Sequence, residues 1–76
     1  MSHEEVADLI DRFLRRQSAY PQEWNDFAET RQSDPEIEEY RKRCDELDPL
    51  VNCPGVQDPK ALEELNRIVE KLRSRV

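Results

Sequence analysis

The sequence predicts an all-α fold, a small single-domain bundle of about four helices, two longer and two shorter, spanning residues 1–76. A chain of 76 residues supports one domain and has few large side chains to spare from its core. Apolar residues recur at helical spacings of three and four, and the five prolines and the single glycine fall at plausible element boundaries. These observations favour helices joined by short turns.

The first helix is expected from about residue 3 to 17. Ser2 and Glu5 have the spacing of a capping box, which marks a helix start. Behind them the apolar residues lie on one helical face, at Val6, Leu9, Ile10, Phe13 and Leu14. Near the C-terminal end of this helix, positive charges interact favourably with the helix dipole. Three arginines lie there: Arg12, Arg15 and Arg16.

A second, short helix is expected to start at Pro21, because proline is tolerated in the first turn of a helix. It lies in the stretch "YPQEWNDF" at 20–27, which holds three of the five aromatic residues. Trp24 and Phe27 fall on one side of this helix with Ala28 and are expected to anchor the core. The helix should stop near residue 32.

The third helix is expected to begin after Ser33 and Asp34, with Pro35 in its first turn. Its buried stripe is formed by Ile37, Tyr40, Cys44 and Leu47. The following "DPLVNCPGV" at 48–56 holds two prolines and the only glycine, so we expect an ordered loop there. Its apolar residues should pack on the bundle, at Leu50, Val51 and Val56.

Asp58 and Pro59 open the last helix by the same cap chemistry. Its apolar residues step by three and four in a heptad seam that Ile68 widens, at Leu62, Leu65, Val69, Leu72 and Val76. Two heptads are too few to predict an independent coiled coil. We therefore expect this face to pack inside the bundle, with a homodimer seam as the alternative.

Charge patterning gives the clearest functional signal. Residues 1–50 hold 14 acidic and 7 basic side chains, net −7, whereas residues 51–76 hold 4 and 5, net +1. Such a surface repels the polyanionic backbone of DNA or RNA, so no nucleic-acid partner is expected. A basic protein partner would be attracted. The alternative is that the acids only solvate helix faces.

The residues offer little for catalysis or metal binding. Two cysteines and one histidine are too few for a structural zinc site, and Leu47 stands where a calcium loop needs an oxygen ligand. Cys44 lies on an apolar stripe, and no base can be placed beside Cys53. We expect no enzyme, no cofactor and no metal, with a thiol enzyme or redox sensor at Cys53 as the weakest alternative.

Targeting signals are absent from the sequence as given. The N-terminal stretch has no basic segment followed by an apolar run, and no stretch reaches the roughly 18 apolar residues of a membrane span. The expected location is cytoplasmic, without membrane contact. In a reducing cytosol Cys44 and Cys53 should be thiols, although their spacing also permits a disulfide.

Tyr20 precedes Pro21 at a helix entrance and should be half-buried at best. Glu23, Asp26 and Glu29 are expected to face solvent on the same short helix. Tyr20, with Glu23 and Asp26 beside it, is therefore the best candidate in the chain for a small contact patch. The candidate partner-binding residues are therefore Tyr20, Glu23, Asp26 and Glu29.

The order "LIDRFL", then "YPQEWNDF", then a helix with a cysteine and a C-terminal helix ending "LRSRV" resembles a group of small acidic bacterial proteins of unassigned function. In that group the aromatic motif more often has two aspartates, where this chain has Asn25 and Asp26. The resemblance supplies no catalytic or binding residues. A looser similarity, in size and charge, links the chain to small helical immunity proteins.

These observations lead to a first hypothesis: a non-enzymatic protein-binding module, such as an inhibitor or immunity protein, that docks on a basic partner through its acidic N-terminal portion. The alternative is a self-associating structural module that uses the C-terminal heptad face.

Overall fold

The computed structural model describes residues 1–53 and 55–75, and these contain four helices and no strand. The helices are α1 (His3–Leu14), α2 (Glu23–Glu29), α3 (Pro35–Val51) and α4 (Pro59–Arg73). The predicted all-α bundle is confirmed. The two longer helices are α3 and α4, with 17 and 15 residues, and the two shorter ones are α1 and α2, with 12 and 7.

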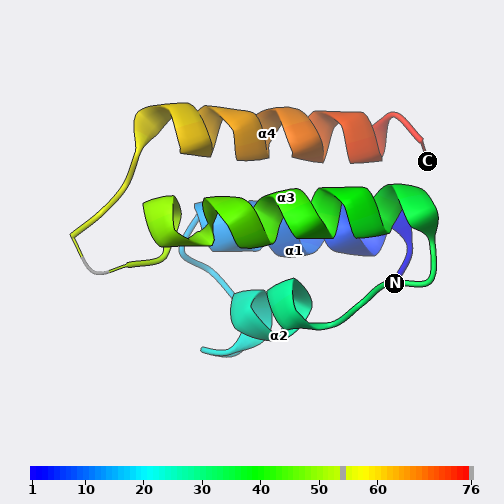
Figure 1. Ribbon diagram of the computed structural model, residues 1–76, viewed down its shortest axis with the longest axis horizontal. Helices are drawn as coiled ribbons and strands as arrows, with labels where there is room; N and C mark the ends of the chain where they lie inside the picture. The colour runs from blue at the N-terminus through cyan, green and yellow to red at the C-terminus, as the bar shows by residue number, and fades with distance from the viewer. Residues whose placement is uncertain (54, 76) are drawn as a thin grey trace.

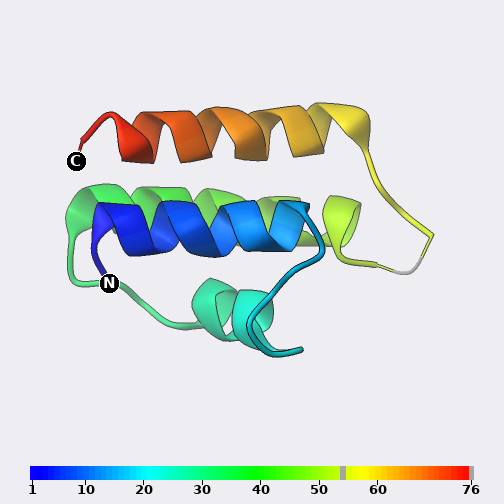
Figure 2. The same ribbon diagram turned by 180° about the vertical axis from the view of Figure 1, so that it is seen from behind.

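Helices α1, α3 and α4 follow the long axis of the molecule (Figure 1). Helices α1 and α3 run in the same direction at the middle level, and α4 runs back along them in the opposite direction. Helix α2 lies on the side away from α4 (Figure 2). The short helix is thus attached to one flank of a bundle whose other flank is formed by α4.

Three helix starts follow the predicted cap chemistry. Ser2 and Glu5 form a capping box, in which the Glu5 amide donates to Ser2 Oγ and the Ser2 amide donates to the Glu5 carboxylate, at 3.1 and 2.8 Å. Asp34 and Asp58 each accept two backbone amides of the helix that they precede. Each is followed by a proline, whose missing N–H would be unsatisfied at that position anyway.

Helix α1 ends at Leu14, three residues earlier than predicted, in a left-handed turn. The Gln17 amide donates to the Arg12 carbonyl at 2.8 Å, and the Arg16 amide donates to the Phe13 carbonyl at 3.1 Å. These are the two hydrogen bonds of a Schellman motif. Its left-handed position, usually a glycine, is occupied by Arg16 with φ 60°.

Helix α2 is shorter at both ends than the sequence predicts. Pro21 belongs to a turn in which the Glu23 amide donates to the Tyr20 carbonyl at 3.1 Å. The helix begins at Glu23 and ends at Glu29 instead of near residue 32. No side chain caps its start at Gln22, so this helix begins without the cap chemistry that fixes the other three.

Helix α3 continues through Pro49 to Val51, where a loop was predicted from residue 48. Proline removes one amide donor, yet the extra turn buries Val51 to 1% exposure and lets the Asn52 amide bond the Asp48 carbonyl at 2.8 Å. The predicted packing of Leu50 and Val56 is wrong, since they are 41% and 42% exposed. Pro54, inside the predicted loop, lies outside the described residues.

The core is built mainly from the predicted helical faces. Helix α4 buries Ala61, Leu65, Ile68, Val69 and Leu72, and Leu62 is partly buried against them. The heptad face therefore packs inside the bundle, as expected. Val76, the last residue of the predicted seam, lies outside the described residues.

Candidate functional site

Three of the four predicted contact residues line one surface groove of about 520 Å³, beside α1, α2 and the segment after α2. They are Tyr20, Glu23 and Asp26, and Leu9 and Phe27 also line it. Glu29 is exposed on α2 but does not line this groove. We call this hollow the α2 groove.

Glu23 does not face solvent, contrary to the prediction. Its side chain turns toward α1, where Arg12 Nε and Nη2 donate to its two carboxylate oxygens at 3.0 and 2.9 Å. The Ala19 amide adds a third hydrogen bond at 3.1 Å. These bonds, Arg12 first, hold the pKa of Glu23 below its usual value and leave the residue 6% exposed. Its carboxylate joins α2 to α1 through these hydrogen bonds and is not free to contact a partner.

Tyr20 and Asp26 form the exposed pair of the site. The Tyr20 hydroxyl donates to Asp26 Oδ2 at 3.1 Å, which raises the pKa of Tyr20 above its usual value. Tyr20 is 48% exposed, as the sequence predicts for a residue at the helix entrance. It lines the α2 groove and also a second surface hollow, so one side chain borders both depressions.

Trp24 anchors α2 in the core, as predicted. Its ring stacks on Phe13 with centroids 4.0 Å apart and an interplanar angle of 16°, and it is 2% exposed. The indole Nε1 donates to Asp48 Oδ1 at 2.7 Å. Next to it, Asn52 Nδ2 donates to Asn25 Oδ1 at 2.9 Å. Both polar contacts depend on the last turn of α3, which the sequence did not predict.

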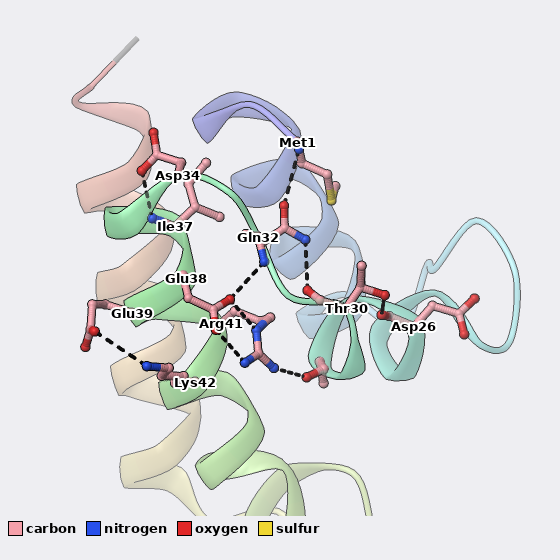
Figure 3. Close-up of polar contacts among 11 residues, drawn as sticks. Met1, Asp26, Thr30, Gln32, Asp34, Ile37, Glu38, Glu39, Arg41 and Lys42 are labelled. Carbon is pink, nitrogen blue, oxygen red and sulfur yellow. Dashed lines mark hydrogen bonds and ion pairs between the residues drawn. The ribbon is translucent and has the colours of Figure 1, made fainter.

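A second polar cluster fixes the C-terminal end of α2 (Figure 3). Glu38 on α3 accepts two hydrogen bonds from Arg41, at 2.7 and 2.8 Å, and one from the Gln32 amide at 2.9 Å. Arg41 also donates to the Ala28 carbonyl. Hydrogen bonding from Arg41, and then from Gln32, lowers the pKa of Glu38 to about 2. Sequence reasoning missed this cluster, since nothing local pairs Glu38 with residues before α3.

The two thiols lie in different environments. Cys44 is buried in the core, and this burial raises the pKa of its thiol to about 12, so the side chain is a neutral apolar group at pH 7. Cys53 is exposed. Over residues 1–53 and 55–75 no group of three or more histidine, cysteine or carboxylate side chains is arranged to hold a metal ion.

No helix in the described ranges has the length and apolar character required to cross a membrane. Comparison with protein-family models, with curated proteins and with solved structures finds no match to this chain. A function can therefore be proposed only from the contacts and charges of the site itself.

Proposed function

We propose that the protein is a non-enzymatic binding module that docks on a basic surface of a partner protein, in the manner of an inhibitor or immunity protein. The contact is centred on Tyr20, Asp26 and Glu29. The observation that carries the proposal is the exposed Tyr20–Asp26 pair, a hydrogen-bonded aromatic side chain and carboxylate that line the α2 groove, with Tyr20 also bordering a second hollow. Tyrosine is enriched among the residues that dominate binding energy at interfaces.

The charges beside this pair support a basic partner. Within the described chain, no ion pair neutralises Asp26 or Glu29, and both are exposed. Residues 1–50, which include this pair, carry net −7. Negative potential over this region would speed the approach of a basic surface and would be screened by salt. Glu23, which the sequence placed in the contact, has no part in it because Arg12 already neutralises it.

Two charge-reversal variants of equal net charge test the proposal. Asp26→Lys with Glu29→Lys changes the proposed contact, and Asp45→Lys with Glu70→Lys changes two exposed acids that line neither hollow beside Tyr20. Each tagged protein is used to capture partners from lysate of the source organism at low and high salt, with identification by mass spectrometry.

We expect one basic protein to be retained at low salt by the wild type and by the Asp45/Glu70 variant, and to be lost with the Asp26/Glu29 variant. Equal capture by both variants would show that the acidic surface acts without a defined site. Capture of only the protein itself would contradict the proposal and favour self-association. Burial of the α4 apolar face in the monomer already counts against a dimer through that seam.

A further inference from the structure

The second hollow beside Tyr20 has a different chemistry from the α2 groove. It measures about 400 Å³ and lies where the end of α1, the start of α2 and the end of α3 meet. Its walls include Arg16, Ser18, Tyr20, Pro21, Asn25 and Asn52, over the stacked rings of Phe13 and Trp24. We call it the Arg16 groove.

Arg16 is the only charged side chain among the described residues that line this groove. That is unusual in a chain with net charge −6 and 18 acidic residues. No carboxylate of the described chain forms an ion pair with Arg16, although most of the other arginines have such a partner. The groove therefore presents an unneutralised guanidinium in an otherwise acidic protein.

The backbone at Arg16 gives a second, independent reason to assign it a role. Its φ of 60° lies in the left-handed region, which residues other than glycine adopt at a cost. Glycine would satisfy the Schellman turn better. A weak structural explanation is available, since the guanidinium lies 6.0 Å from the centre of the Phe13 ring, but that distance is at the limit of a cation–π contact.

The polar and apolar groups that line the groove indicate which chemical groups a ligand would need. The Arg16 guanidinium and the Ser18 hydroxyl are hydrogen-bond donors, and the amides of Asn25 and Asn52 are already bonded to one another at 2.9 Å. Pro21 and the exposed face of Tyr20 add an apolar wall. Guanidinium groups bind carboxylates through strong, charge-assisted and often bidentate hydrogen bonds.

We propose that the Arg16 groove binds a carboxylate that a peptide chain carries next to an apolar side chain. The carboxylate contacts the Arg16 guanidinium, and the apolar side chain lies against Tyr20 and Pro21. The chemistry is shared by a C-terminal carboxylate and by an acidic side chain with an apolar neighbour. This site shares Tyr20 with the proposed basic-partner contact, but Asp26 and Glu29 do not line the Arg16 groove, so the two sites can be tested independently through those two carboxylates and Arg16.

Titration of the ¹⁵N-labelled full chain, followed by amide chemical shifts, tests the assignment. The probes are N-acetylphenylalanine for a terminal carboxylate, N-acetylglutamyl-phenylalaninamide for a side-chain carboxylate, and N-acetylphenylalaninamide as the neutral control. We expect saturable shifts at residues 16–20 and at the side-chain amides of Asn25 and Asn52 with one or both carboxylates. The neutral amide should bind at least about tenfold more weakly, the loss expected for one charge-assisted contact.

Three variants separate binding from structure. Arg16→Gln should weaken carboxylate binding about tenfold or more, whereas Arg31→Gln, which changes an exposed arginine outside this groove, should not. Arg16→Gly should raise Tm by relieving the left-handed backbone and still abolish binding. This pair of effects would show that the side chain is kept for a ligand and not for stability.

Binding that is unchanged in Arg16→Gln, equal affinity for the neutral amide, or an equal response to inorganic phosphate would overturn the carboxylate assignment. Glu29→Gln, which leaves the Tyr20–Asp26 hydrogen bond in place and lies outside the Arg16 groove, should bind the carboxylate probes like the wild type. Failure of the basic-partner proposal would therefore leave this result intact, and the reverse also holds.

Discussion

Helix α4 presents five buried apolar side chains to the core along its length, whereas α2 presents three and completes its attachment with polar side chains. The ion pairs of α4 lie at its exposed edge, as in the contact of Arg73 with Asp8 at 3.3 Å. Among the described residues α2 has one ion pair, between Glu23 and Arg12, and its carboxylate is shielded, with the Glu23 side chain 7% exposed.

The difference lies in what each attachment depends on. Apolar burial is insensitive to the ionisation of side chains, so the packing of α4 should change little with pH. The attachment of α2 includes two carboxylates with lowered pKa values, Glu23 and Glu38, and therefore requires both to be ionised. We expect α2 to open locally at a lower free energy than α4.

The largest expected change in the free energy of unfolding comes from truncating a buried apolar side chain of α4. Leu65 is fully buried, so Leu65→Ala should lower the free energy of unfolding by about 2–5 kcal/mol, measured by urea denaturation with circular dichroism. Leu62→Ala, at a partly buried position of the same helix, is the control and should cost less. A loss at Leu65 no larger than the loss at Leu62 would show that the degree of burial on α4 does not determine how much a side chain stabilises the fold.

A smaller effect is expected at the polar attachment of α2. Glu23→Gln preserves the shape of the side chain but removes the charge that accepts three hydrogen bonds. The loss should be about 1–3 kcal/mol and should appear as faster hydrogen exchange of α2 amides, with α4 unchanged. Glu29→Gln, exposed on the same helix, should leave exchange as in the wild type. A uniform increase along the whole chain would contradict local opening.

The smallest expected effect is a dependence of the local stability of α2 on pH, through the ionisation of Glu38. The folded pKa of Glu38 is about 2, below the value of 4.5 for a free glutamate. The stabilisation from its ionised form is therefore complete above pH about 4.5 and lost as the pH falls toward about 2. Acidification over this range should lower the protection factors of amides in α2 and in residues 30–34 earlier than those of amides in α4. In Glu38→Gln this acid sensitivity should be reduced; an unaltered profile would assign it to other groups.

Sequence reasoning succeeded where the determining signals are local. The start of α4 follows from Asp58 and Pro59, and its buried face follows from the spacing of its leucines and valines. The end of α3 was missed because Pro49 is a local breaker that distant contacts override: the last turn buries Val51 and brings Asp48 to Trp24.

The candidate site divides in the same way. The exposure of Tyr20 follows from its place before Pro21, and the prediction for it agrees with the structure. The burial of Glu23 depends on Arg12, which lies 11 positions away on another helix, and no spacing rule joins them. Arg16 was grouped with the helix-end arginines, because without a glycine there the sequence did not indicate a left-handed turn.

The position of Trp24 also gives the protein an intrinsic optical probe. The chain has one tryptophan, and it lies in the short helix with its indole stacked on Phe13 and hydrogen-bonded to Asp48. Its fluorescence should therefore follow detachment of that helix, while far-ultraviolet circular dichroism is dominated by α1, α3 and α4. A fluorescence transition that precedes the loss of ellipticity during denaturation would be a sign of this partial opening and a departure from two-state behaviour.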